Sequence, residues 1–150
     1  MRPKIISISN QKGGVGKTTT SINLGSSFAV LGKRTLLIDL DPQANATTGL
    51  GYNPDSFSSH IYHVMIGEKD AGSVIQETKL KDFCLISSHP DLVGVEVELM
   101  DVPLRERILS RALASVSGEF DFIVIDCPPS LGLLTLNALT AAHSLLVPVQ

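Results

Sequence analysis

Residues 4–20 read KIISISNQKGGVGKTTT. The first six are a short β-branched run that predicts a buried strand, and the glycine-rich segment after them ends in Gly16-Lys17-Thr18. No proline interrupts residues 18–31, and Gly32 followed by two cations is a helix stop signal. Strand, glycine-rich loop and helix in this order predict a phosphate-binding loop, because backbone N–H groups converge at the positive end of the helix.

The loop residues predict how a nucleoside triphosphate and Mg²⁺ are held. Lys17 is placed to neutralise the β- and γ-phosphates, the Thr18 hydroxyl to bind Mg²⁺, and Thr19 to reach the α-phosphate. The backbone that curls around the phosphates is expected to be that of Gly13, Gly14, Val15 and Gly16. The alternative interpretation, a chance glycine-rich turn before a helix, does not account for the Gly-Lys-Thr ending.

One deviation narrows the class of loop. The general pattern has a glycine at the position of Gln11, and an additional lysine, Lys12, precedes the glycine pair. A lysine beside glycines that approach phosphate is expected to stabilise charge, although a lone loop lysine is ordinarily a solvated one.

Two apolar strands are expected to end in carboxylates. Residues 35–41 read TLLIDLD and end in Asp39 and Asp41, and residues 120–126 read FDFIVID and end in Asp126. Because the carboxyl ends of parallel strands meet at one edge of a sheet, these groups are expected near the loop. Asp126 is expected to hold Mg²⁺ through water, Asp41 to orient or activate the attacking water, and Asp39 to brace the strand end or the loop. Each is alternatively a cap for the following turn.

The strands alternate with helices along the chain, which predicts an α/β fold with a doubly wound, mostly parallel sheet. Further strands are expected at residues 83–87 and 144–149, and a loop with one helical turn at 42–59. Helices are expected at 60–67, 72–78, 91–100, 103–116 and 131–142. Residues 1–150 are expected to form a single P-loop ATPase domain. Because the last strand has no helix to cover it, we expect this domain to be the N-terminal portion of a longer one.

Composition narrows the function classes. The chain is 43% hydrophobic and 18% charged, a globular balance, and its net charge of −3 gives no overall attraction for nucleic acid or acidic membranes. No stretch approaches the roughly 18 apolar residues of a membrane span, no signal peptide is evident, and a reducing cytoplasm is the expected location. The spacing of the histidines and cysteines predicts no metal site and no disulfide framework. These are His60, His63, His89, His143, Cys84 and Cys127.

With these motifs the sequence resembles the ParA-type partition ATPases, the Soj-like chromosome and plasmid segregation proteins, within the deviant Walker-A ATPases. The strongest matches are residues 10–20, residues 36–47, which read LLIDLDPQANAT, and residues 120–130. The resemblance implies a P-loop ATPase that binds and hydrolyses ATP with Mg²⁺ and forms a sandwich homodimer in the ATP state.

The resemblance also implies roles for individual residues. Lys12 corresponds to the signature lysine that reaches the partner's nucleotide, Lys17 and Thr18 to the phosphate and Mg²⁺ ligands, Asp41 to the carboxylate tied to hydrolysis, and Asp126 to the Walker-B aspartate. The expected catalytic residues are therefore Lys12, Lys17 and Asp41. In the full-length form the ATP dimer is expected to bind DNA non-specifically, through residues beyond this chain, and to associate with the bacterial nucleoid and not with a membrane. A centromere-binding adaptor of the ParB type is the expected partner.

Three alternatives stay open. A MinD-like membrane or division-site ATPase is disfavoured by the segment from Asp41 to Asn45 and by the lack of a C-terminal amphipathic helix. A metabolic enzyme on the same fold, such as a phosphoryl-activating synthetase, uses the same kind of loop. A nucleotide-binding fragment without turnover is the third.

Overall fold

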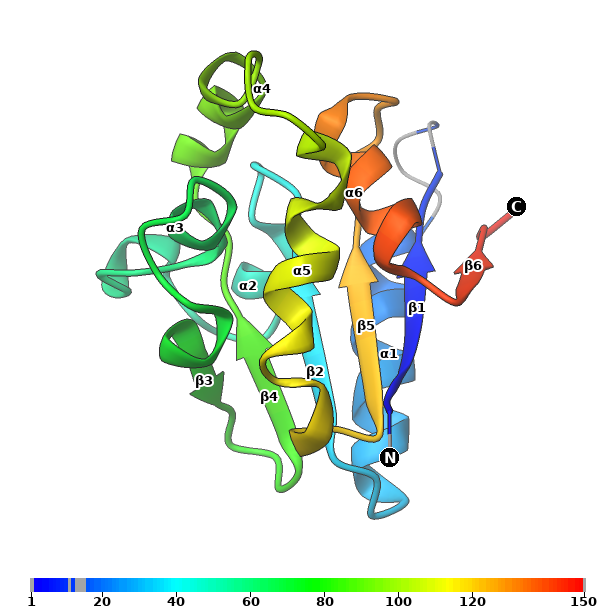
Figure 1. Cartoon of the computed structure of the whole chain (residues 1–150). Coiled ribbons are helices and arrows are strands. Elements are labelled where there is room, and N and C mark those ends of the chain that lie inside the picture. Colours follow the sequence, from blue (N-terminus) through cyan, green and yellow to red (C-terminus); the bar gives the residue numbers. More distant parts are fainter. Residues whose placement is uncertain (1, 11, 13–15, 150) are drawn as a thin grey trace.

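The computed structural model describes residues 2–10, 12 and 16–149, and its centre is a six-stranded sheet (Figure 1). The order of the strands across the sheet is β3-β4-β2-β5-β1-β6. All neighbouring strands are parallel except β3 and β4, which are antiparallel. The strands are β1 (Lys4–Ile8), β2 (Thr35–Asp39), β3 (Ile75–Glu77), β4 (Phe83–Ile86), β5 (Phe122–Asp126) and β6 (Ser144–Leu146).

Helices follow most of the strands. The α-helices are α1 (Lys17–Val30), α2 (Asn45–Gly49), α3 (Ile61–Met65), α4 (Val95–Glu98), α5 (Ile108–Ala114) and α6 (Leu133–Ala141). Short 3₁₀ turns are η1 (Pro54–Ser56), η2 (Ala71–Val74), η3 (Pro90–Gly94), η4 (Arg105–Arg107) and η5 (Ser117–Glu119). Among the described residues, none of these helices combines the length and the apolar character that crossing a membrane requires.

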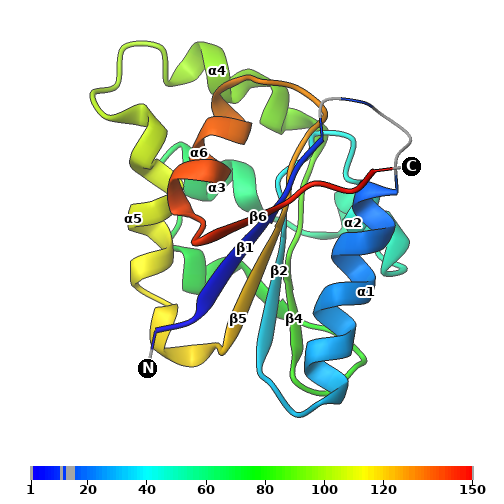
Figure 2. The same ribbon diagram turned by 90° about the vertical axis from the view of Figure 1, so that its right-hand side faces the viewer.

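The sheet is buried on both faces, with α1 and α2 on one side and α3, α5 and α6 on the other (Figure 2). Successive side chains of a strand point to opposite faces, so Leu37 of β2 packs with α1 while Leu36 and Ile38 pack with the opposite helices. This arrangement confirms the predicted α/β fold with a doubly wound, mostly parallel sheet.

The end of α1 lies where the sequence predicts it. Gly32 has a φ of 83°, its N–H donates to the Ala29 carbonyl at 2.9 Å, and the Lys33 N–H donates to the Phe28 carbonyl at 3.0 Å. These two hydrogen bonds form a Schellman motif, a common way for a helix to end at glycine. The chain then turns back and enters β2 at the centre of the sheet.

The prediction of a helix at residues 72–78 is wrong. The structure has η2 there, followed by β3, which pairs with β4 so that Ile75 lies opposite Ile86. Thr78 closes this hairpin, because both its N–H and its hydroxyl donate to the Phe83 carbonyl, at 3.0 and 2.7 Å. The pairing of β3 with β4 therefore decides the conformation of these three residues and overrides their local preference for a helix.

The prediction of a continuous helix at residues 103–116 is also wrong for its first part. Leu104 has a φ of 55°, η4 follows it, and regular helix begins only at Ile108. The side chain of Asn137 in α6 substitutes for helical hydrogen bonds: it accepts from the Leu109 N–H at 3.0 Å and donates to the Arg105 carbonyl at 2.9 Å. The helix expected at 91–100 is divided in a similar way, into η3 and α4.

Candidate functional site

The carboxyl ends of three neighbouring strands form the base of the site. Asp126, the last residue of β5, lies opposite Ile8 of β1 on one side and opposite Asp39 of β2 on the other. The segment that leaves β1 leads to α1, whose first residue is Lys17. The parallel register therefore brings the start of α1 and the carboxylates of β2 and β5 to one edge of the sheet, as ligand sites of such sheets require.

Asp126 is the centre of a buried hydrogen-bond network. Its Oδ1 accepts from Lys17 Nζ and from the Ser21 hydroxyl, both at 2.9 Å, and its Oδ2 accepts from the Thr18 hydroxyl at 3.0 Å. Asp126 itself is fully buried and Lys17 is 8% exposed. A buried carboxylate needs such donors, and here all of them come from the first turns of α1.

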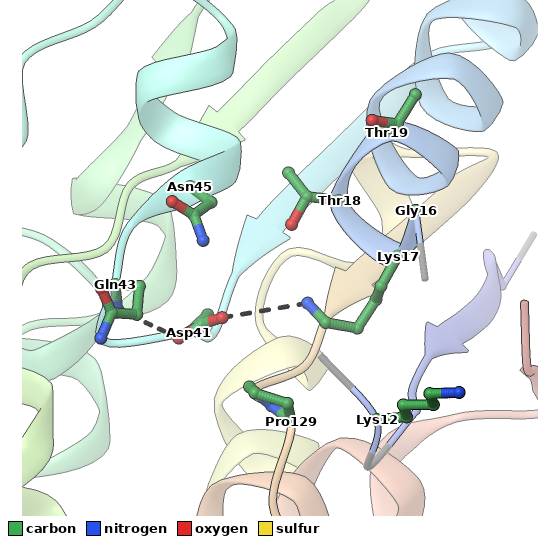
Figure 3. Close-up of a pocket in the computed structure, with 9 residues that line it drawn as sticks. All are labelled: Lys12, Gly16, Lys17, Thr18, Thr19, Asp41, Gln43, Asn45 and Pro129. Carbon is green, nitrogen blue, oxygen red and sulfur yellow. Dashed lines mark hydrogen bonds and ion pairs between the residues drawn. The ribbon is translucent and has the colours of Figure 1, made fainter. Parts of the chain in front are cut away.

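Asp41 faces the same lysine from the other side. Its Oδ2 is 3.9 Å from Lys17 Nζ, and its Oδ1 accepts from the Gln43 N–H at 3.0 Å (Figure 3). Burial raises the pKa of Asp41 above its usual value, against the opposing effects of the Gln43 hydrogen bond and the Lys17 charge. Asp41 is therefore a stronger proton acceptor than an ordinary aspartate, held beside a cation.

A cavity of about 280 Å³ opens between these groups. It is lined by Lys12, Gly16, Lys17, Thr18, Thr19, Asp41, Gln43, Asn45 and Pro129 (Figure 3). The backbone of Gly16 has a φ of 77°, which glycine adopts without strain and which lets the chain enter α1 directly from the loop. The positive N-terminal end of a 14-residue helix thus faces the cavity, a natural environment for an anion.

Asp39 does not line the cavity. Its Oδ2 accepts from both the N–H and the hydroxyl of Thr47, at 2.8 and 2.7 Å, and its Oδ1 accepts from the Asp41 N–H at 3.2 Å. Burial, and secondarily the charge of Asp126, raise the pKa of Asp39 to about 7, despite the Thr47 hydrogen bonds. The structure places Asp39 as a brace between the end of β2 and α2.

Lys12 lines the cavity with its side chain directed away from Lys17 and Asp41 (Figure 3). Lys12 is exposed, and its N–H donates to Asn10 Oδ1 at 2.8 Å. The predictions made for Gly13, Gly14 and Val15 fall outside the described residues.

Several residues of the site were not predicted. Ser21 is the most important of these, and its signal is its spacing, four residues after Lys17 on the same helix face. Gln43, Asn45 and Pro129 line the cavity and lie in the segments that carry the family resemblance, although no role was expected for them.

The histidines lie outside the cavity lining. His143 accepts from the Ile5 N–H through Nδ1 at 3.0 Å. The spacing of the histidines predicts no metal site, and the structure brings the other three close to one another. The ring centre of His60 is 4.5 Å from that of His63 and 4.7 Å from that of His89.

Comparison with known proteins shows the family to which the chain belongs. A family model described as an AAA domain matches residues 3–150. The chain is 50% identical over 147 residues to the sporulation initiation inhibitor protein Soj of Bacillus subtilis, covering 98% of this chain and 58% of that protein. It is 51% identical over 147 residues to the chromosome partitioning protein ParA of Myxococcus xanthus, covering 98% of this chain and 52% of that protein.

A solved structure with a closely similar fold is that of cobyrinic acid a,c-diamide synthase from Mycobacterium smegmatis with bound ATP analog and magnesium. It has a TM-score of 0.96 and 43% sequence identity, and the match covers 99% of this chain and 60% of that one. The chain thus spans somewhat more than half the length of the proteins it matches.

Proposed function

We propose that this chain, which belongs to the AAA domain family and resembles Soj and ParA, is part of a switch for chromosome or plasmid partition. The switch binds and hydrolyses ATP. The observation that carries the proposal is the contact of Lys17 and Thr18 with Asp126 at the start of α1. A cation, a hydroxyl and a carboxylate meet there at a helix N-terminus, which is the chemistry that a magnesium-bound triphosphate requires.

The residues of the site fit ATP and Mg²⁺. The Thr18 hydroxyl and the Asp126 carboxylate, 3.0 Å apart, are the hard oxygen donors that Mg²⁺ prefers, and Asp126 would act through water. When bound, Mg²⁺ would neutralise part of the negative charge on the β- and γ-phosphates. The structurally similar diamide synthase was crystallised with an ATP analog and magnesium, which supports the same ligands here.

The chain's own groups divide the remaining work. Lys17 binds the β- and γ-phosphate oxygens, and the backbone of Gly13, Gly14, Val15 and Gly16, with Thr19, holds the rest of the phosphate chain. Asp41 orients the attacking water and accepts its proton, since its raised pKa makes it a stronger base than an exposed aspartate. These residues stabilise developing charge and position the nucleophile, which is most of what catalysis of phosphoryl transfer demands.

We further propose that the ATP-bound form is a homodimer in which Lys12 reaches the phosphates of the partner's nucleotide. The exposure of Lys12 and its direction away from its own Lys17 and Asp41 support this assignment (Figure 3). Non-specific DNA binding through residues beyond this chain, association with the nucleoid, and stimulation of hydrolysis by a ParB-type adaptor complete the proposal. Residues 1–150 form part of a single ATPase domain in this account.

One alternative has an observation in its favour. The 43% identity to a diamide synthase is compatible with a metabolic enzyme that activates a carboxylic acid with the same loop. The names of the Soj and ParA relatives, which match with 50% and 51% identity, favour partition. Nothing in the comparisons favours a MinD-like membrane-site regulator over the partition branch.

Hydrolysis and ATP binding by the full-length protein test the proposal. Lys17→Ala should weaken ATP binding by about 100-fold, because about two charge-assisted hydrogen bonds to phosphate are lost. Asp41→Ala should retain ATP binding and lose hydrolysis by about 10²-fold or more. Lys33→Ala, an exposed lysine just beyond the far end of α1, is the control for charge. Normal hydrolysis by Asp41→Ala would contradict the role given to that carboxylate.

A further inference from the structure

A cluster of nitrogen and oxygen ligands lies apart from the ATP site. Among the described residues, His60, His89 and Asp91 each offer one ligand atom, and these atoms all lie within 4.8 Å of one another. His60 directly precedes α3, His89 directly precedes η3, and Asp91 is in η3. The fold therefore brings His60 beside His89 and Asp91, which lie close together in a later segment of the sequence. Two histidines and a carboxylate are a combination typical of transition-metal sites.

The buried histidine of this cluster has an unused ligand atom. His60 is only 3% exposed, and within the part of the chain that the structure describes its Nδ1 has no hydrogen-bond partner. Native structures rarely leave a buried polar nitrogen unpaired, because the hydrogen bond that it made with water is then lost without replacement. A bound metal ion would satisfy this nitrogen.

His89 is already oriented as a metal ligand usually is. Its Nε2 is 2.8 Å from Asp55 Oδ1, and its Nδ1 is 3.4 Å from Asp91 Oδ2. A carboxylate on the second ring nitrogen is the common partner of a metal-binding histidine. The 3.4 Å separation is near the ~3.3 Å between ligands that follows from tetrahedral bonds of about 2.0 Å to zinc.

The backbone holds the two histidine segments together. The Ile61 N–H donates to the Ser87 carbonyl at 3.0 Å, next to His60 on one segment and two residues before His89 on the other. The fold therefore places the two histidine segments side by side. What must still move are side chains near the surface, since His89 is 20% and Asp91 62% exposed.

We propose that His60, His89 and Asp91 bind one divalent transition metal ion of the zinc class, with water in the fourth position. Coordination through His89 Nδ1 replaces the hydrogen bond that this atom accepts from the Asp91 N–H at 3.1 Å, and the Asp55 carboxylate keeps the Nε2 proton. The imidazole ligands select zinc over magnesium, whereas the hydroxyl and carboxylate of the ATP site select magnesium.

The position of the proposed site links it to the ATP site. Ser88, the neighbour of His89, donates its hydroxyl to the Asp41 carbonyl at 2.6 Å and its N–H to the Thr47 hydroxyl at 3.1 Å. A metal ion that fixes His89 against His60 would restrain the segment that holds the Asp41 backbone.

Zinc binding by the full-length protein tests the proposal. The protein, freed of metal with a chelator, is titrated with zinc chloride in a calorimeter with excess Mg²⁺ present, so that the ATP site does not compete. We expect one zinc ion per chain and a zinc-dependent increase in the melting temperature. His89→Gln and Asp91→Asn, changes near the surface that leave buried His60 intact, should each weaken binding by about tenfold or more.

His63→Gln is the matched control, because His63 Nδ1 accepts from the His60 N–H at 3.1 Å and is not one of the three ligands. Its zinc affinity should equal that of the unaltered protein. Absence of zinc binding, equal affinity in His89→Gln and Asp91→Asn, or an equal loss in His63→Gln would overturn the assignment.

Discussion

At the scale of single residues, Asp126 explains most of the candidate site. Three donors from two turns of α1, Lys17, Thr18 and Ser21, meet its two oxygens at 2.9 to 3.0 Å. The network ties the phosphate-loop helix to the centre of the sheet. The side chains to which we assign the binding of ATP and Mg²⁺ therefore also stabilise the fold, and a change in this network should alter the free energy of unfolding.

Ser21→Ala should lower the free energy of unfolding by about 1–2 kcal/mol, because one hydrogen bond to a buried carboxylate is lost while alanine slightly favours the helix. Urea unfolding measures the change. Ser27→Ala, at an exposed position of the same helix, should change it by less than about 0.5 kcal/mol. Equal effects of the two substitutions would contradict the role given to Ser21.

Asp39 should titrate near pH 7. Its pKa is about 7 in the folded protein, whereas that of an ordinary aspartate is 3.8. Between these two pH values the carboxyl is therefore protonated in the folded state and ionised in the unfolded state. The stabilisation from this group is complete below about pH 4 and is lost as the pH rises to about 7. The ¹³C shift of the Asp39 carboxyl should have its midpoint near pH 7. A midpoint near pH 4 would show that the Thr47 hydrogen bonds outweigh burial.

At the scale of elements, α1 packs very closely on the sheet at Gly25. A Cβ built at Gly25 would lie 2.8 Å from Cε1 of Phe83, a buried ring in β4. Gly25→Ala should therefore destabilise the protein by about 1–3 kcal/mol, although alanine is the better helix former.

A double-mutant cycle with Phe83→Leu separates the two effects on the free energy of unfolding. The smaller side chain makes room, so the double variant should lose less stability than the sum of the single variants. An increase in stability for Gly25→Ala alone would mean that helix preference outweighs the contact.

The elements also show which structural features a sequence predicts. The strands beginning at Lys4, Thr35 and Phe83, and the end of α1 at Gly32, follow from apolar runs and a glycine signal that act locally. The strand β3 does not, since it exists only through pairing with β4. The irregular start of α5 is not local either, because the Asn137 side chain, which is remote in sequence, bonds the backbone of Arg105 and Leu109.

The same distinction applies to the site. Lys17, Thr18, Asp41 and Asp126 come together as expected, because loop and strand-end positions are fixed by the parallel sheet. Ser21 was missed because its spacing from Lys17 places it on the same helix face but does not show that this face meets Asp126. The His60 cluster was missed because histidine spacing along the chain says nothing about contacts between remote turns.

At the scale of the whole molecule, the sequence spans only part of the relatives that it matches. The sequence covers 58% of the Soj relative and 52% of the ParA relative. Lys17, Thr18 and Asp41 line the cavity that we propose for the phosphates and Mg²⁺. Lys12 is exposed and lines the same cavity, with its side chain directed away from Lys17 and Asp41. We propose that ATP joins two such chains through this lysine.

The mass of the full-length protein in solution, measured by light scattering, tests that claim most directly. Asp41→Ala is the background for the measurement, because slow hydrolysis keeps ATP bound. With ATP and Mg²⁺ its mass should double, and with ADP it should stay that of one chain. Addition of Lys12→Ala should leave ATP binding intact and return the mass to that of one chain. The same doubled mass with and without Lys12 would contradict the account.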